Sequence, residues 1–146
     1  SPVLVDSRFR LSEFTGFTAA TPNQEELENL LGAQFSSPEQ LETAAHKLKQ
    51  QLGYQALLVT RGSQGMTLIE DNVAPLHIRA VGAQQAVDVT GAGDTVIATF
   101  ALALASSASF SDAARLANYA GGLVVMKRGT ATVTAAELEH SILADA

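Results

Sequence analysis

The segment Gly91-Ala92-Gly93-Asp94-Thr95 combines small residues with an acid, directly before the mostly apolar stretch of residues 96–105. Such a stretch is typical of a buried helix, and the backbone N–H groups of a helix's first turn have no partner within the helix. These groups attract anions, and small residues let an anion come close to the backbone. The segment is therefore a candidate phosphate-binding helix start.

The residue sequence of this segment does not match the two commonest glycine-rich phosphate-binding motifs. A Rossmann fingerprint needs a third glycine where Val96 stands, and a P-loop needs Gly-Lys-Ser/Thr, which occurs nowhere in the sequence. Asp94 is then the unusual feature, because its carboxylate would repel a phosphate bound at the same helix start. Two interpretations stay open: Asp94 takes a proton from an attacking hydroxyl, or it is a first-turn acid that complements the helix dipole.

Composition and charge narrow the class of protein. A chain of 146 residues with 47% hydrophobic content can form one domain with a sizeable core, so we treat residues 1–146 as a single portion. The net charge of −6 comes without any Lys/Arg block, so we expect no nucleic-acid partner. The sequence has no cysteine, which suits a reducing compartment.

Membrane and export signals are also missing from the sequence as given. The longest apolar run is far shorter than the ~20 residues of a spanning helix, so we expect no membrane partner. The start, Ser1-Pro2-Val3, lacks the features of a signal peptide, and we expect a cytoplasmic protein. His46, His77 and His140 are too dispersed to suggest a metal site, and we expect them to be surface or structural residues.

Short apolar runs predict the strands. Residues 3–5, 56–59 and 66–69 are such runs, a further strand ends at residue 20, and another spans residues 74–81. Asp71-Asn72 predicts a tight turn, and therefore a hairpin, between the last two strands. Residues 3–5 end in the polar Asp6-Ser7-Arg8, as a buried parallel strand does at its carboxyl end. Because the chain opens inside this strand, it looks truncated.

Start and stop signals predict the helices. One follows Thr21-Pro22-Asn23 and stops at Gly32, and another runs from the N-cap Ser37 to about Leu52. Three more begin near residues 91, 109 and 134, the last with a capping box between Thr134 and Glu137. Alternating strands and helices predict an α/β fold with a mainly parallel sheet flanked by helices and one β-hairpin.

The segment DVTGAGDT, residues 88–95, closely resembles the second signature of the ribokinase-like, or PfkB-type, carbohydrate kinases, which typically reads DTTGAGD. The resemblance implies a ribokinase-like fold and an ATP- and Mg²⁺-dependent carbohydrate kinase. It implies that Asp94 is the catalytic base and that the amides of Gly91, Ala92 and Gly93 form the anion hole for the transferred phosphoryl group. Val89 is the one departure inside the motif, where the family usually has Thr.

Two other stretches fall in the family's order. TPNQEE resembles the family's Asn-x-x-Glu element, which implies that Asn23 lies near the triphosphate and that Glu26 organises magnesium through water. The alternative is a plain helix cap made by the same two residues. TRGSQGM resembles a Thr-x-Gly-x-x-Gly stretch that lines the nucleotide, which implies this role for Thr60, Gly62 and Gly65. The alternative for that stretch is a simple hairpin entry.

The remaining implied positions concern the adenine and a cation. Asn118 matches an asparagine that borders the adenine in these kinases, although a lone helical asparagine has many uses. Asp88 and Thr90 match a loop that often binds a monovalent cation such as K⁺, and the alternative is an Asx turn before the helix. Within the family, the stretches VLVDSR, ATPNQEELENLLG and KRGTATVT are most similar to the heptose-phosphate kinase branch of ADP-heptose synthesis.

The family's kinases are longer than this chain, and they place the sugar-binding residues and a small β lid in their amino-terminal half. The lid excludes water and often supplies a homodimer contact, so we expect the isolated chain to bind nucleotide but to be inactive as a kinase. Two alternatives from other classes stay open. The chain could be a non-catalytic nucleotide-binding module, or a fragment that serves as a scaffold or subunit partner.

Overall fold

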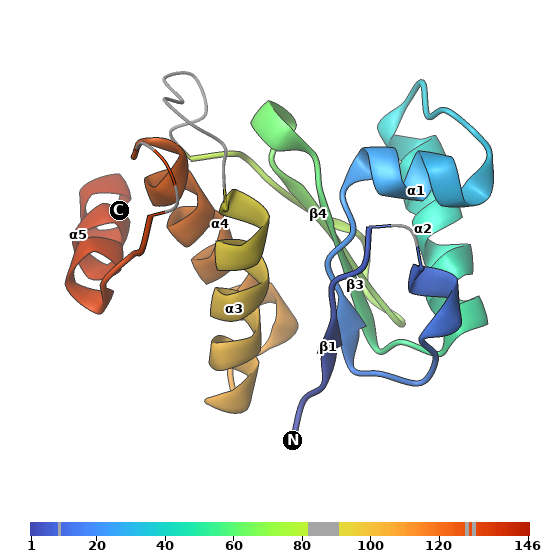
Figure 1. Cartoon of the computed structure of the whole chain (residues 1–146), viewed down its shortest axis with the longest axis horizontal. Coiled ribbons are helices and arrows are strands. Elements are labelled where there is room, and N and C mark those ends of the chain that lie inside the picture. Colours follow the sequence, from blue (N-terminus) through green and yellow to red (C-terminus); the bar gives the residue numbers. More distant parts are fainter. Residues whose placement is uncertain (9, 82–90, 128, 130) are drawn as a thin grey trace. The chain divides into compact units, whose positions relative to one another are not determined.

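The computed structural model describes residues 1–8, 10–81, 91–127, 129 and 131–146 (Figure 1). The chain folds into two compact units. The first contains residues 1–61 and 66–77, and the second contains residues 62–65 and 78–146. No helix among the described residues is long and apolar enough to cross a membrane.

The strands follow one another across the sheet in the order of the chain, from β1 to β5. β1 pairs with β2 and β2 with β3 in parallel, whereas β3 and β4 are antiparallel. The sheet is therefore mixed. In its parallel part, the carboxyl ends of β1, β2 and β3 lie at the same edge. The strands are β1 (Leu4–Val5), β2 (Ala19–Ala20), β3 (Ala56–Thr60), β4 (Met66–Glu70) and β5 (Leu76–Ile78).

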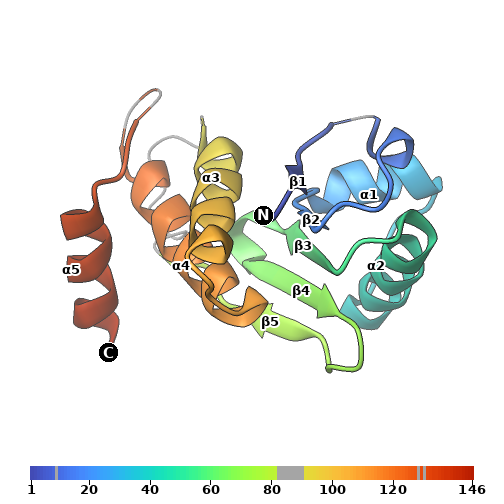
Figure 2. The same cartoon turned by 90° about the horizontal axis from the view of Figure 1, so that it is seen from below.

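The hairpin predicted at Asp71-Asn72 is present. Asn72 has a φ of 59° in the turn after β4, and Figure 2 shows β4 and β5 running in opposite directions. β5 is shorter than the predicted strand of residues 74–81, because Pro75 has no N–H group to give to the ladder and ends the pairing there. One hairpin was expected. The structure contains a second change of chain direction, between the antiparallel strands β3 and β4.

Two helices cover the sheet of the first unit, and their ends lie where the sequence signals put them. α1 (Gln24–Leu31) is capped by Asn23 and stops at Gly32, whose φ is 63°. α2 (Pro38–Leu52) is capped by the Ser37 side chain and stops at Gly53. A short 3₁₀ turn, residues 11–13, precedes β2.

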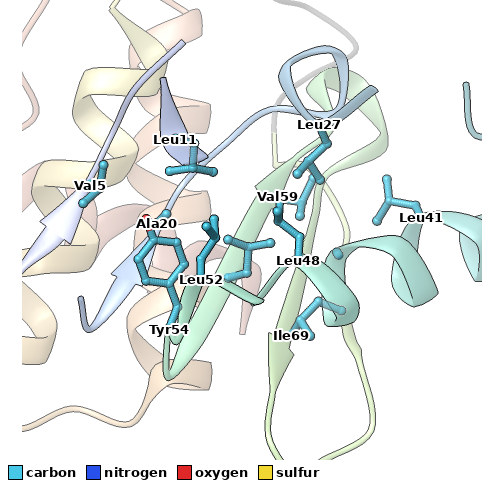
Figure 3. Close-up of a cluster of buried hydrophobic side chains, with 12 residues drawn as sticks. Val5, Leu11, Ala20, Leu27, Leu41, Leu48, Leu52, Tyr54, Val59 and Ile69 are labelled. Atoms are coloured by element: carbon cyan, nitrogen blue, oxygen red, sulfur yellow. The ribbon is translucent and has the colours of Figure 1, made fainter. Parts of the chain in front are cut away.

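The core of the first unit lies between these helices and the sheet (Figure 3). Leucines of both helices pack against side chains of the strands, and Leu27 and Leu41 are fully buried. Burying one such leucine contributes roughly 1.5–3 kcal/mol, so this cluster holds α1 at a fixed place beside the strand ends. The labelled members of the cluster are Val5, Leu11, Ala20, Leu27, Leu41, Leu48, Leu52, Tyr54, Val59 and Ile69.

The second unit contains three α-helices, α3 (Ala92–Ala105), α4 (Phe110–Val125) and α5 (Ala135–Asp145), and a 3₁₀ turn at Gly62–Gln64. α3 packs along α4, and a Cβ atom added at Gly121 would lie 3.0 Å from Cγ2 of Val96. The glycine therefore lets the two helices approach closely. Thr134 and Glu137 form the predicted capping box of α5.

Candidate functional site

The start of α3 differs from the starts of the other described α-helices. Its N-cap is Gly91, in the left-handed region with φ 77° and ψ 0°, and no side chain caps the helix. The other four α-helices each have a side chain that accepts a hydrogen bond from the first turn. The N-terminal donors of α3 are thus left for another partner. The capping residues of the other helices are Asn23, Ser37, Ser109 and Thr134.

The space around this helix start is open. The first hydrogen bond of α3 runs from the Thr95 N–H to the Gly91 carbonyl at 3.0 Å, so the amides of Ala92, Gly93 and Asp94 precede the helical ladder. A Cβ atom added at Gly91 or Gly93 would meet nothing within 4 Å. An anion could therefore approach this backbone closely, with the positive end of the helix dipole behind it.

Asp94 lies on the same turn as these amides. Its side chain is exposed and makes no hydrogen bond or salt bridge with any residue that the structure describes. An exposed carboxylate beside an anion-binding turn can accept a proton from a hydroxyl held there. The same position also suits an acid that complements the helix dipole, so the role of Asp94 stays a prediction.

In the first unit, Asn23 and Thr60 are neighbours although they lie far apart in the sequence. They form a parallel β-bridge between the segment after β2 and the last residue of β3, and the Thr60 N–H donates to the Pro22 carbonyl at 3.0 Å. Parallel strands end at the same edge of a sheet, and open α/β sheets bind ligands at that edge. The structure thus brings together two of the residues that the sequence predicts at the nucleotide.

Asn23 and Glu26 form a complete capping box. The Asn23 Oδ1 accepts from the Glu26 N–H at 2.7 Å, and the Glu26 Oε2 accepts from the Asn23 N–H at 2.9 Å. The helix-cap alternative is therefore present in the structure.

The cap does not use all of Glu26. Its other oxygen, Oε1, accepts no hydrogen bond from the described residues, and burial raises the pKa of the carboxyl. A carboxylate oxygen is the hard donor that Mg²⁺ and its bound waters prefer, so Glu26 fits the role of organising this metal. The Asn23 side chain uses one lone pair of Oδ1 for the cap, and its second lone pair and its amide NH₂ group remain for a ligand.

Gly62 and Gly65 lie beside the 3₁₀ turn that follows β3. Gly65 has a φ of 89°, and a Cβ atom there would lie 1.9 Å from the Ile78 carbonyl oxygen, so only glycine fits. Gly62 has a φ of 56° and open space around it. Packing within the unit accounts for Gly65, whereas Gly62 has room for a ligand beside it.

Asn118 is buried in α4, with 5% of its surface exposed, and its Nδ2 donates to the Arg79 carbonyl at 2.7 Å. This bond gives Asn118 a structural role within the second unit, and its predicted place at the adenine stays a prediction. Asp88 and Thr90, the predicted ligands of a monovalent cation, lie outside the described residues.

Two of the three histidines, His46 and His77, have structural partners. The His77 ring bonds to the Thr67 hydroxyl at 3.0 Å and to the Glu42 carboxylate at 2.5 Å, and His46 bonds to Gln50. No group of three or more potential metal ligands occurs within the described part of the chain.

Sequence reasoning assigned no role to Arg8, which the structure places in a pocket with Glu26. Ser7, Arg8, Pro22 and Glu26 line this pocket, together with three leucines beneath them. The signal was present in the sequence, because Asp6-Ser7-Arg8 directly follows a strand whose carboxyl end lies at the ligand-binding edge.

Comparison with known proteins identifies relatives of this chain. Two relatives, each named bifunctional protein HldE, come from Coxiella burnetii and Caulobacter vibrioides. The Coxiella protein is 46% identical over 97% of this chain and 30% of its own length, and the Caulobacter protein is 49% identical over 94% of this chain and 29% of its own. The chain therefore spans about a third or less of the curated relatives it matches.

Solved structures confirm the ribokinase-like fold predicted from the sequence. Arabidopsis thaliana ribokinase, complexed with ribose and ATP, is similar with a TM-score of 0.84 and 29% identity, over 97% of this chain and 47% of that one. Escherichia coli phosphofructokinase-2, in complex with substrates and products, is similar with a TM-score of 0.80 over 92% of this chain and 42% of that one, and its 21% identity supports the fold alone.

A family match covers most of the chain. Residues 10–137 match the family described as pfkB family carbohydrate kinase, and this span includes the Asn23 bridge, the turn after β3 and the start of α3. On these residues and this fold, the chain belongs to the pfkB family of carbohydrate kinases.

Proposed function

We propose that residues 1–146 form the nucleotide-binding and catalytic portion of a cytoplasmic kinase that transfers a phosphoryl group from ATP to a hydroxyl of a sugar or sugar phosphate. The observation that supports this most is the start of α3, where uncapped amides and the Asp94 carboxylate share one exposed turn. Membership of the pfkB family supports the reaction class.

The proposed chemistry uses two features of that turn. Asp94 accepts the proton of the attacking hydroxyl, which raises the nucleophilicity of its oxygen. The amides of residues 91–94 donate hydrogen bonds to the oxygens of the transferred phosphoryl group, where negative charge is redistributed during an in-line displacement. These donors are fixed by the helix, so they need no reorganisation during the reaction.

The remaining predicted residues would bind the nucleotide and its ions. We place Asn23, Thr60, Gly62 and Gly65 along the nucleotide, with Asn118 near the adenine. Glu26 would hold Mg²⁺ through water, and the metal would neutralise charge on the phosphates. Asp88 and Thr90 would bind a monovalent cation, for which K⁺ is the candidate; a related phosphofructokinase-2 structure is described as a complex with potassium.

None of the predicted roles recognises a sugar, so the acceptor is proposed from the relatives. We propose a heptose phosphate as the first acceptor to test, since the sequence is similar to that branch and both relatives are HldE proteins. The isolated chain should bind nucleotide without turnover, because the lid that shields this site from water in the family's kinases is placed in their amino-terminal half.

An acceptor panel tests this function. The full-length protein is incubated with ATP, Mg²⁺ and one of a series of sugars and sugar phosphates, including a heptose phosphate, and ADP formation is followed. We expect ADP to form only with a matching acceptor. Tight ATP binding in calorimetry without turnover for any acceptor would instead favour a non-catalytic nucleotide-binding module, and absence of nucleotide binding would favour a scaffold.

A further inference from the structure

We infer that Arg8 binds a phosphate group of the magnesium-bound nucleotide, beside the Glu26 carboxylate. This inference rests on the proposed function, because it names a further residue of the same nucleotide site. It gives a role to a side chain that neither the glycine-rich motif nor the capping box includes.

Arg8 has the right place in the fold. It follows β1 at the carboxyl edge of the parallel strands, where Asn23 follows β2 and Thr60 ends β3. Because β1, β2 and β3 are parallel neighbours, the three strand ends lie side by side. A cationic side chain at such an edge is well placed to meet an anionic ligand.

Arg8 and Glu26 line one pocket of the first unit. The cavity itself is small, about 20 Å³. Pockets for a whole small-molecule ligand usually measure roughly 300–1,000 Å³, so this one has room for one small group of a ligand beside Arg8 and Glu26 and not for a nucleoside. The side chains that line the pocket are those of Ser7, Arg8, Pro22 and Glu26 together with the apolar Leu11, Leu27 and Leu30.

The Arg8 side chain is also available to bind a ligand. It is exposed and forms no hydrogen bond or salt bridge with the residues that the structure describes. The nearby Arg10, by contrast, holds both oxygens of Glu13, at 2.9 and 2.5 Å. A guanidinium whose five N–H groups make no hydrogen bond to the described residues can bind two phosphate oxygens at once.

The charges around the pocket favour a phosphate that arrives with its metal. Arg8 lowers the pKa of Glu26, whereas Asp6 and Glu25 raise it, so these groups lie within electrostatic range of one another. A bare phosphate would meet the carboxylates of Glu25 and Glu26 as well as the Arg8 guanidinium. A magnesium-bound nucleotide brings its own cation for Glu26 and leaves a phosphate oxygen for Arg8, which is why we assign the nucleotide rather than the acceptor.

The test compares Arg8→Gln with Arg10→Gln in the full-length protein. Calorimetry measures the dissociation constants of MgATP and of adenosine, which has no phosphate. We expect Arg8→Gln to weaken MgATP binding roughly tenfold or more, the usual effect of losing a charge-assisted hydrogen bond, and to leave adenosine binding unchanged. Arg8→Lys should recover part of the loss, and Arg10→Gln should bind both ligands like the wild type.

Wild-type MgATP affinity in Arg8→Gln would overturn the inference, and so would a variant in which only the KM of the acceptor rises. Failure of the wild type itself to bind ATP would instead reject the proposed function. Thermal unfolding checks that each variant is folded. If glutamine destabilises the protein, Arg8→Met makes the same comparison, because it keeps an aliphatic stem against the leucines.

Discussion

The side chains of Asn23 and Glu26 each accept a hydrogen bond from the other residue's backbone, at 2.7 and 2.9 Å. The pair predicted to serve the triphosphate and magnesium is therefore also the N-terminal cap of α1. Stability and the proposed metal binding would depend on different atoms of Glu26, since the cap uses Oε2 and Oε1 accepts no hydrogen bond from the described residues. The two roles can be separated by experiment.

The Glu26→Gln variant should retain the capping hydrogen bonds of α1 but bind Mg²⁺ more weakly. Glutamine also serves at this position of a capping box, so the midpoint of thermal unfolding should not change. The Mg²⁺ concentration for half-maximal turnover should rise roughly tenfold or more, as when a supporting group of a metal site is lost. Glu26→Ala should show the same kinetic defect and also lose roughly 0.5–1 kcal/mol of stability. Normal magnesium dependence in Glu26→Gln would make Glu26 a cap residue alone.

Gly93→Ala tests whether an anion rests on the start of α3. The added methyl group would meet nothing within 4 Å in the protein, and alanine is a better helix former by about 1 kcal/mol, so stability should hold or rise. Turnover should fall at least about tenfold, because the methyl group occupies the approach of the phosphoryl group. Ser111→Ala, at the equivalent position of α4, is the matched control and should leave turnover unchanged. Undiminished turnover in Gly93→Ala would place the anion elsewhere.

Gly65→Ala and Gly62→Ala separate packing from backbone strain. Both residues have positive φ, but only at Gly65 would the new Cβ atom collide with a carbonyl oxygen, that of Ile78. Urea denaturation should show a loss of about 1 kcal/mol for Gly62→Ala and at least about 2 kcal/mol for Gly65→Ala. Equal losses in the two variants would mean that the turn adapts to the methyl group.

Low pH should weaken the ion pair between Lys127 and Glu137, the first-turn acid of α5. The Lys127 ammonium, with further hydrogen bonds from Thr134, lowers the pKa of Glu137 from 4.5 to about 2. A folded-state pKa below the unfolded one stabilises the protein above pH 4.5, and this stabilisation is lost as the pH falls from 4.5 towards 2. Thermal unfolding between pH 6 and pH 3 should therefore show a steeper decline for the wild type than for Glu137→Gln. Parallel curves would mean that the ion pair contributes nothing.

Local signals made most of the elements predictable. Ser37 and Gly53 bound α2, and Thr134 with Glu137 starts α5, because a cap acts on residues within one turn of itself. The small residues before an apolar stretch located the start of α3. The resemblance assigned both Asn23 and Thr60 to the nucleotide but did not predict the bridge between them. It could not tell the two roles of Glu26 apart, since both need the same residue types at the same spacing.

Contacts between distant residues were not predictable from the sequence. Lys49 is 1% exposed, although lysine is rarely buried, because its ammonium donates to the Tyr54 carbonyl and to Asp71 in the turn after β4. The role inferred for Arg8 likewise depends on Glu26, which reaches the same pocket from α1. A periodic pattern shows which face of an element is buried, but not which side chain of another element meets it.

The most direct test of the account is Asp94→Asn in the full-length protein, with Asp112→Asn as its control. Asp112 holds the same first-turn position in α4 as Asp94 does in α3, so the two variants remove the same helix-dipole interaction. We predict that Asp94→Asn lowers kcat by at least about 10²-fold, because no group remains to accept the hydroxyl proton, while the dissociation constant of MgATP stays nearly the same. Asp112→Asn should keep full turnover. Near-normal turnover in Asp94→Asn would contradict its role as the base.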